Sequence, residues 1–286
     1  MKKILFNYAH NAFYTAQTFN AQSGLAVGNF DVAHQFRFHD IDGEFYKKNK
    51  FILDQPKGAG YWIWKYYFAL KLLEDESVGE DDIIFYSDSG SHFISSIDPM
   101  VKVFKRDNLS VMTFLQLHKS TLFTKRDLFV LTGCDEPKYT NTCQRVGGWI
   151  MFKKDDFSLN FFDELLKYAV DYRIIADSPS QCGLPEYPDF FRHQHDESLI
   201  SVIAKKYELY PYRNPSQHGM IDLRKSNNEY TQQSYERYME TPELWDIHEV
   251  GQGHAWDYKT FEQYPPVPSD TKSDYPTILE LTRNRA

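Results

Sequence analysis

The amino-acid sequence predicts an α/β fold in which a mixed sheet is flanked by helices and followed by an irregular C-terminal region. Three observations predict it. Strand-like and helix-like hydrophobic patterns alternate over roughly the first two hundred residues. Hydrophobic residues make up 42 % of the 286 residues, which is enough for a large core and too many for a disordered chain. The clearest strand leads into a polar turn that contains glycine, and ligands of α/β sheets bind beyond such strand ends.

The first part of the chain contains two strand-like and two helix-like segments. Residues 4–9 form a short apolar run that ends in polar residues, which is typical of a buried strand. Residues 13–27 carry apolar side chains at helical spacing until Gly28 ends the segment. Residues 30–38 predict the second strand, and residues 42–52 combine charged with aromatic side chains, which favours a helix.

The middle of the chain has the strongest periodicity. Apolar side chains recur every three or four positions over residues 61–76, which predicts a helix. Acidic residues separate this helix from residues 83–86, the clearest strand, and that strand leads into a polar turn at residues 87–92. Residues 111–117 and 149–152 are also predicted strands.

Two more helices and an irregular region complete the predicted fold. Residues 157–172 have apolar side chains at helical spacing with acidic residues near the start, and residues 197–207 follow a cluster of polar side chains. The pattern weakens after about residue 212. We therefore expect a single domain over residues 1–264. The chain is proline-rich and polar from Pro265, so we expect residues 265–286 to form a loosely packed tail.

Charge, hydropathy and cysteine content exclude several classes of function. Forty acidic and 32 basic residues give a net charge of −8, so the chain lacks the basic excess that proteins use to bind nucleic-acid phosphates. No apolar run reaches the about 18 residues of a membrane span. The three cysteines form no metal-type pair, although their spacing permits a bridge between Cys134 and Cys143. We expect a soluble cytoplasmic protein with no nucleic-acid partner, no membrane span and no obligate protein partner.

The turn after the clearest strand is the first candidate site. Residues 85–90 (FYSDSG) bring one carboxylate, Asp88, to a strand end. Hard divalent cations prefer carboxylate oxygens, and a phosphate-bearing ligand can supply the remaining ligands. The sequence therefore predicts a Mn²⁺ or Mg²⁺ site at Asp88. The alternative is a turn in which Asp88 caps backbone amides.

A second candidate lies at residues 58–65 (GAGYWIWK). Glycines at a predicted helix start allow a ligand to approach closely, and the free amides there favour anions. Lys65 is then available to neutralise a phosphate, with the aromatic side chains beside it. The alternative is that the tryptophans belong to the core and that Lys65 is solvated.

Two histidine-containing segments complete the candidates. Residues 191–198 (FRHQHDES) gather polar side chains at the start of an apolar helix. One of Asp196 and Glu197 can act there as a general base, or as a ligand for the hydroxyl of an acceptor, with the histidines adjusting its pKa. The alternative is that they are simply acidic residues that the helix dipole favours at a helix start. His254 lies in a glycine-containing loop, where it is either structural or closes over a ligand or binds a metal.

Taken in order, residues 49–53, 58–65, 83–90 and 195–201 resemble a glycosyltransferase family found among bacterial surface and capsular polysaccharide enzymes and in large DNA viruses. The corresponding family segments are approximately GAGYWxWKP, YxDAG and HDQS, and the resemblance covers roughly residues 1–210. It implies a GT-A fold, with a nucleotide-binding sheet, a metal-binding turn of the DxD type and an adjoining acceptor region.

The chain departs from this family at three places. Tyr66 stands where the family often has proline, and Glu197 stands where it has glutamine. The metal turn offers only one carboxylate, Asp88, in place of an Asp-x-Asp pair. We therefore expect His92 or His254 to complete the cation site, or the diphosphate and water to fill it.

The resemblance implies a hexosyl- or pentosyltransferase that moves a sugar from a nucleotide-sugar to a hydroxyl of a glycan acceptor, in surface-polysaccharide or glycoprotein-glycan synthesis. The default donor is a UDP-sugar such as UDP-galactose, UDP-glucose or UDP-xylose. We expect residues 1–120 to bind mainly the donor and residues 121–264 mainly the acceptor. The alternatives are a nucleotide-sugar hydrolase or phosphotransferase with the same metal turn, and a noncatalytic glycan-binding module.

On this interpretation each candidate residue has an expected role. Asp196 is the base for the acceptor hydroxyl in an inverting enzyme, and in a retaining enzyme it positions substrate near the anomeric carbon. Lys65 assists at the phosphates, and Tyr8 and His10 meet the base or ribose. The donor-binding residues are Tyr8, His10, Tyr61, Trp64, Lys65, Asp88 and Gly90, the acceptor-binding residues are His193, His195 and Glu197, and the metal ligands are Asp88 and His254.

Overall fold

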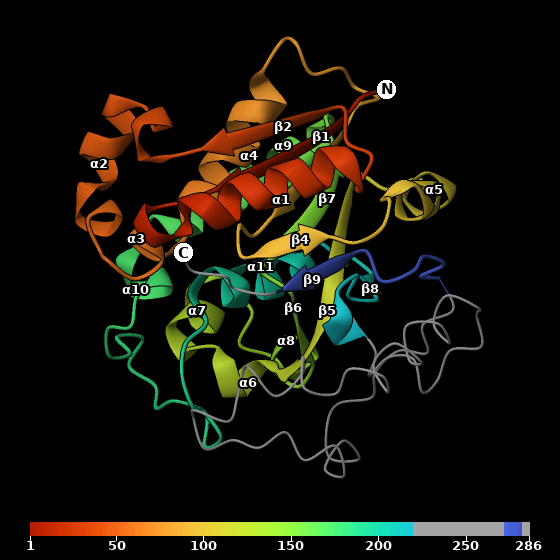
Figure 1. Cartoon of the computed structure of the whole chain (residues 1–286). Coiled ribbons are helices and arrows are strands. Elements are labelled where there is room, and N and C mark those ends of the chain that lie inside the picture. The colour runs from red at the N-terminus through yellow and green to blue at the C-terminus, as the bar shows by residue number, and fades with distance from the viewer. Residues whose placement is uncertain (220–271, 282–286) are drawn as a thin grey trace.

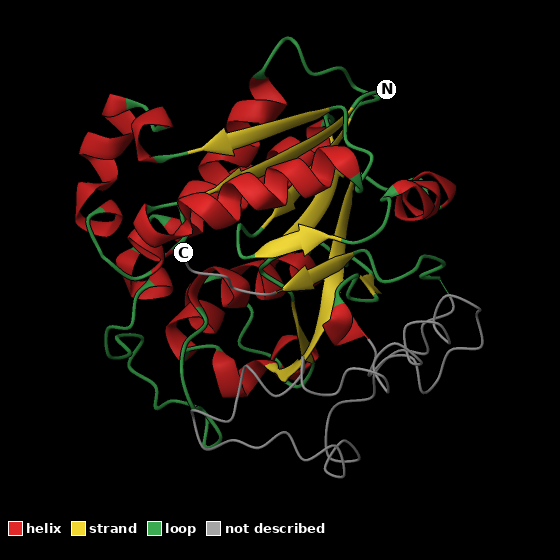
Figure 2. Cartoon of the chain, in the orientation of Figure 1, coloured by secondary structure: helices red, strands yellow, loops and turns green. Residues whose placement is uncertain are grey.

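The computed structural model of the chain describes residues 1–219 and 272–281, and it is an α/β protein as the sequence predicts (Figure 2). The strands are β1 (Lys3–Tyr8), β2 (Val32–Phe36), β3 (Ile83–Ser87), β4 (Ser91–Phe93), β5 (Val111–Lys119), β6 (Cys143–Arg145), β7 (Trp149–Lys153), β8 (Pro211–Tyr212) and β9 (Leu279–Leu281). The helices are α1 (Tyr14–Ala26), α2 (Gly43–Leu53), α3 (Gly58–Tyr61), α4 (Trp64–Glu74), α5 (Asp98–Arg106), α6 (Ser120–Phe123), α7 (Arg126–Leu131), α8 (Pro137–Thr140), α9 (Asp156–Ala169), α10 (Tyr172–Ile175) and α11 (His195–Lys206), with short 3-10 helices at Asn11–Phe13 and Phe38–Asp40.

One mixed sheet forms the centre of the molecule. Its strand order is β2-β1-β3-β7-β5-β6, and β8 pairs with β5. β1 runs parallel to β2 and to β3, whereas β7 is antiparallel to β3 and β5. Because β1 and β3 are parallel neighbours, their carboxyl ends meet at one edge of the sheet. The polar segments that follow Tyr8 and Ser87 therefore start side by side.

Helices cover both faces of the sheet. Successive side chains along β1 point to opposite faces, so they belong to two different cores. Ile4, Phe6 and Tyr8 belong to the core on the side of α4, α9 and α11. Leu5 belongs to the opposite core, on the side of α5 and the β4–β9 pair. Figure 1 shows α1 and the β4–β9 pair in front of the sheet and α4 and α9 behind it.

The helix predicted over residues 61–76 begins later than expected. α4 starts at Trp64, and the five residues before Ile63, residues 58–62, all have positive φ angles, between 49° and 98°. Glycine tolerates this left-handed backbone and accounts for two of the five positions. The indole N–H of Trp64 donates to the Gly58 carbonyl at 2.9 Å and ties the segment to the helix. The hydrophobic pattern could not reveal this turn, because it continues across the segment unchanged.

The prediction of a loosely packed tail is wrong for residues 272–281. Tyr275, Ile278 and Leu279 are fully buried, and β9 pairs antiparallel with β4. The Tyr275 hydroxyl donates to the Arg213 carbonyl at 2.5 Å. A short apolar run at 275–281 drives this packing. Proline and polar residues surround the run, so the average composition of the region does not reveal it.

Smaller differences concern element boundaries and the cysteines. The strand predicted over residues 30–38 is limited to Val32–Phe36, and α5 was not predicted. All three cysteines are free thiols, so Cys134 and Cys143 do not form a bridge. Among the described residues, none of the helices is both long and apolar enough to cross a membrane.

Candidate active site

A cleft of about 560 Å³ opens where β1 and β3 end, a size typical of small-molecule sites. The left-handed segment contributes Gly58, Ala59 and Trp62 to its wall. Lys65 and Tyr61 do not line the cleft but lie behind its wall, and His254 lies outside the described residues. The cleft brings together most of the predicted site residues, namely Tyr8, His10, Trp64, Asp88, Gly90, His193, His195, Asp196 and Glu197.

Asp88 is held at the cleft by its backbone and by a tyrosine. Its amide N–H donates to the Gly148 carbonyl at 2.8 Å, and its own carbonyl accepts from the Ser91 hydroxyl at 2.7 Å. The Tyr86 hydroxyl donates to Asp88 Oδ1 at 2.5 Å. Burial, with the Asp88 charge, raises the pKa of Tyr86 well above its usual value, so Tyr86 remains a donor. The carboxylate therefore has a fixed position.

Lys65 forms an ion pair with Asp196 instead of facing the cleft. Its side chain is 2 % exposed, and its Nζ donates to Asp196 Oδ2 and, at 2.5 Å, to the Gly147 carbonyl. Nζ also lies 4.6 Å above the ring of Tyr86, whose hydroxyl donates to Asp88 Oδ1. The predicted contact of Lys65 with phosphates is thus replaced by contacts that position Asp196.

The two carboxyl groups at the start of α11 are hard to ionise. Burial raises the pKa of Asp196 to about 6, against the opposing effect of Lys65. Burial likewise raises the pKa of Glu197 to about 7, although the Gly147 N–H donates to its Oε2 at 3.1 Å. Glu197 Oε1 is buried without a hydrogen bond to any described residue. Its neighbour at 3.8 Å is His118 Nδ1, and burial lowers the pKa of His118 to about 3.

We expect Glu197→Gln to stabilise the protein at pH 8 and to have little effect at pH 5. The folded-state pKa of Glu197 lies above its ordinary value of 4.5, so ionisation opposes folding. This cost is absent below about pH 4.5, grows as the pH rises and is complete above about pH 7. Glutamine carries no charge and keeps an acceptor for the Gly147 N–H.

The Glu197 side chain is 19 % exposed, so water reduces the cost, and we expect a gain of about 1–2 kcal/mol at pH 8. Denaturant unfolding of both proteins at the two pH values measures it. An equal difference at pH 5 and pH 8 would contradict the assignment of a raised pKa.

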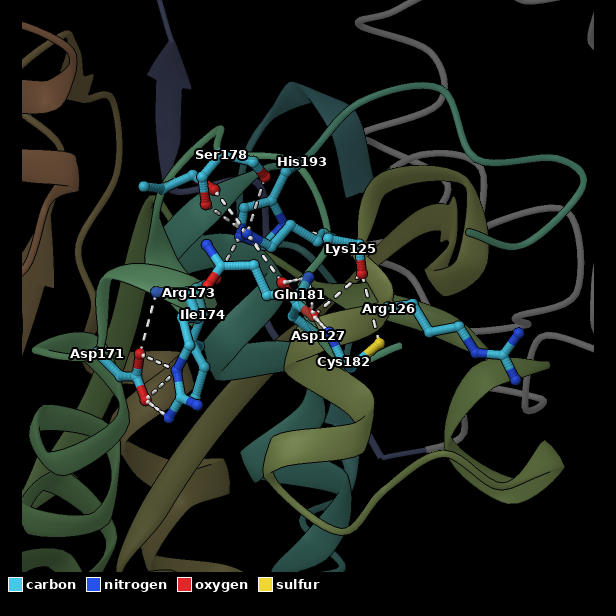
Figure 3. A network of polar contacts seen from close by, with 12 residues as sticks. Lys125, Arg126, Asp127, Asp171, Arg173, Ile174, Ser178, Gln181, Cys182 and His193 are labelled. Carbon is cyan, nitrogen blue, oxygen red and sulfur yellow. Dashed lines mark hydrogen bonds and ion pairs between the residues drawn. The ribbon is translucent and has the colours of Figure 1, made fainter. Parts of the chain in front are cut away.

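His193 is fixed by backbone groups on both sides, as Figure 3 shows. Its Nδ1 accepts from the Lys125 amide at 3.3 Å, and its Nε2 lies 2.8 Å from the Ile174 carbonyl. Lys125 is itself held by the Ser178 carbonyl and hydroxyl, each at 3.1 Å, and by an ion pair with the buried Asp127. With both ring nitrogens engaged, His193 offers a ligand only its ring face, contrary to a direct hydrogen-bonding role toward the acceptor.

His195 differs from His193 in its hydrogen bonding. Its ring stacks on His193 with centroids 5.2 Å apart, and the Tyr61 ring lies 5.1 Å away. The side chain is 2 % exposed, and neither ring nitrogen makes a hydrogen bond to a described residue, although Nε2 lies 3.3 Å from Asp177 Oδ1. Burial lowers the pKa of His195 to about 3, so the ring is neutral. A neutral ring with unused nitrogens at a cleft is suited to a hydroxyl ligand.

Tyr8 carries another buried polar atom without a described partner. Its ring stacks on Trp64 with centroids 4.0 Å apart, and its hydroxyl oxygen has no hydrogen bond within residues 1–219 or 272–281. Burial raises the pKa of Tyr8 far above its usual value, so the hydroxyl stays protonated. His10 and Gly90 lie beside it on the cleft. Buried polar groups are normally satisfied, so this end of the cleft fits a polar ligand.

Gly147 and Gly148 are site residues that the sequence reasoning missed. A Cβ at position 147 would lie 2.9 Å from Glu197 Cβ, and a Cβ at position 148 would lie 3.2 Å from Asp88 Oδ2. The backbone can therefore pass between the side chains of Asp88 and Asp196 only because Gly147 and Gly148 have no side chains of their own. The available signal was a Gly-Gly pair directly before the predicted strand at 149–152.

The residues at Asp88 fit a divalent cation that a ligand helps to hold. Tyr86 occupies one carboxylate oxygen, and the other faces the space that Gly148 leaves open. Within the described ranges, no three His, Cys, Asp or Glu side chains cluster as a metal cage. His92, a proposed second ligand, pairs with Glu280 at 3.6 Å and does not line the cleft. The protein offers the cation one carboxylate ligand, so phosphate oxygens and water would fill the other coordination positions.

No protein-family model matches the chain, and no curated protein matches its sequence. Among solved structures, mouse xyloside xylosyltransferase 1 has a TM-score of 0.47 at 7 % identity, covering 98 % of this chain and 96 % of that chain. The galactosyltransferase LgtC has a TM-score of 0.43 at 11 % identity, covering 98 % and 86 %. Core-mannan synthase A of Aspergillus fumigatus, in its Mn/GDP form, has a TM-score of 0.40 at 7 % identity, covering 71 % and 69 %.

Proposed function

We propose that this protein is a glycosyltransferase that uses a nucleotide-sugar, and that the cleft is its active site. One observation carries the proposal. Asp88 and Asp196 lie on either side of the Gly147–Gly148 backbone and are linked through Tyr86 and Lys65. This pair stands at the sheet edge where α/β proteins bind nucleotides, beside buried polar atoms that lack described partners.

The donor is proposed to bind mainly to residues 1–120. Asp88, together with a divalent cation, holds the diphosphate, and Tyr8, His10 and Gly90 meet the nucleoside. When bound, Mn²⁺ or Mg²⁺ supplies a Lewis acid that neutralises charge on the departing diphosphate. The default donor is a UDP-sugar.

The acceptor is proposed to bind mainly to the later half of the chain, at His195 and Glu197. In the transfer, the bond between the anomeric carbon and the diphosphate oxygen breaks, and its electron pair stays on the diphosphate. The acceptor oxygen bonds to the anomeric carbon, and its proton passes to the Asp196 carboxylate. Asp196 faces the reacting hydroxyl, and Lys65 keeps it ionised near neutral pH, which suits a base with a pKa of about 6.

Calorimetry with UDP, GDP and ADP tests the binding part of this proposal. We expect one nucleotide to bind at least about tenfold more tightly with Mn²⁺ than with EDTA, because Asp88 would hold the cation and the cation would supply positive charge to the diphosphate. We expect Mn²⁺ alone to bind weakly, because Asp88 is the one carboxylate assigned to it. Nucleotide binding that is indifferent to metal, or no nucleotide binding, would contradict the proposal.

A further inference from the structure

Helix α1 buries polar as well as small side chains on its face toward the sheet. Gln17, Asn20 and Ser23 are buried there together with Ala16, Ala21 and Gly24, while Phe19 is 48 % exposed and Leu25 is 47 % exposed. A surface helix normally buries its apolar side. Amide side chains that displace apolar ones from a buried face must form specific hydrogen bonds, because an unsatisfied buried amide is costly.

Asn20 forms such hydrogen bonds on both sides of Asp88. Its Nδ2 lies 3.0 Å from Ser87 Oγ, 2.9 Å from the Ser91 carbonyl and 3.4 Å from the Asp88 carbonyl. An amide NH₂ has two protons, so this group bridges the residue before Asp88 and the start of β4 after it. Asn20 therefore links the two ends of the turn that carries Asp88.

Asn7 fixes the orientation of the Asn20 amide. The Asn7 Nδ2 donates to Asn20 Oδ1 at 2.7 Å, which requires that the Asn20 NH₂ points to the turn. Asn7 lies on β1, on the same face of the sheet as Leu5, and it is fully buried. The hydrogen bonds of the two amides thus connect β1 in the central sheet, through α1, to the turn that carries Asp88.

We infer that Asn20, oriented by Asn7, is a positioning residue that sets the place of the Asp88 carboxylate and thereby the affinity for the divalent cation. For its metal part, this inference rests on the proposed function. Asn20 does not line the cleft, so its effect passes through the turn. Loss of a direct partner of a metal-binding side chain typically lowers metal affinity about 10- to 100-fold. Asn20 bonds to the backbone and serines of the turn and not to the Asp88 carboxylate itself, so we expect the lower end of this range.

The test compares Asn20→Leu with Gln17→Leu. Gln17 is an equally buried amide one turn earlier on α1, but it bonds to the Phe36 carbonyl and to Arg37 instead of the turn. Calorimetry with Mn²⁺ in the presence of nucleoside diphosphate is expected to show about tenfold weaker metal binding for Asn20→Leu and unchanged binding for Gln17→Leu. Equal metal affinity in the two variants would overturn the inference.

Hydrogen exchange of the metal-free proteins gives a second readout. We expect the amides of residues 88–91 to exchange about tenfold faster in Asn20→Leu than in Gln17→Leu. Were Asn20→Leu not to fold, Asn7→Ala would take its place. This variant removes the amide that donates to Asn20 Oδ1 at 2.7 Å and leaves the hydrogen bond from Ser91 to the Asp88 carbonyl in place. Unchanged exchange in Asn7→Ala would then overturn the inference. If the wild-type protein binds nucleotide without metal, the proposed function fails, and hydrogen exchange alone decides the role of Asn20.

Discussion

The variant Asp88→Asn is expected to lose turnover by about 100- to 1,000-fold while keeping its fold. Asparagine retains the size of aspartate, and the backbone hydrogen bonds of residue 88 to Gly148 and Ser91 do not depend on the carboxylate. The missing charge removes the assigned cation ligand, so the diphosphate loses its neutralising partner. Release of sugar from the nucleotide-sugar measures turnover, and thermal unfolding measures the fold.

The chain offers a matched control for this variant. Asp81 is an exposed aspartate just before β3, at the end of the strand opposite Asp88. Asp81→Asn removes the same charge from the same strand region and is expected to leave turnover unchanged. Full activity in Asp88→Asn, or an equal loss in both variants, would show that Asp88 does not hold a catalytic cation.

Replacing Lys65 with methionine is expected to have the second largest effect. It leaves the Asp196 carboxylate buried without its cation, and breaking such a pair typically costs about 3–5 kcal/mol of stability. We expect a loss of about 3 kcal/mol at pH 8, together with a loss of turnover of at least about 100-fold, because Asp196 then holds its proton. Denaturant unfolding and the sugar-release assay measure the two effects.

The pH dependence of the stability loss distinguishes the broken Lys65–Asp196 ion pair from a simple loss of packing. The folded-state pKa of Asp196 lies above its ordinary value, so its ionisation opposes folding above about pH 6 and has little effect near pH 4. Removal of Lys65 raises the pKa further, so Lys65→Met is expected to lose less stability at pH 5 than at pH 8. The double variant Lys65→Met/Asp196→Asn is expected to regain most of the stability and none of the activity. Equal losses at both pH values would contradict the ion-pair account.

The sequence predicted the parts of the fold and site that depend on local patterns. Alternating periodicities indicated the mixed α/β class, which the structure confirms. The apolar run that ends in Asp88 placed this carboxylate at a strand end, and the polar cluster before α11 drew attention to Asp196. Such features depend on neighbouring residues along the chain.

Features that depend on distant contacts could not be predicted. Lys65 carries the same charge whether it faces a phosphate or a buried Asp196, and only tertiary packing decides between them. Amide side chains such as those of Gln17 and Asn20 are usually found on the exposed face of a helix. Here both are buried, because Gln17 bonds to β2 and Asn20 bonds to the turn that carries Asp88. The burial of residues 275–281 likewise depends on pairing with β4, far away in sequence.

The most direct test of the proposed function is the release of free sugar from a panel of nucleotide-sugars, with Mn²⁺ or with EDTA. We predict that one donor, by default a UDP-sugar, is hydrolysed slowly by the wild-type protein in Mn²⁺. The same activity is expected to disappear in EDTA and in Asp88→Asn. Release that persists unchanged under both conditions would contradict the metal-assisted mechanism. No release from any donor, together with no nucleotide binding, would contradict the proposed function and favour the alternative of a noncatalytic glycan-binding module.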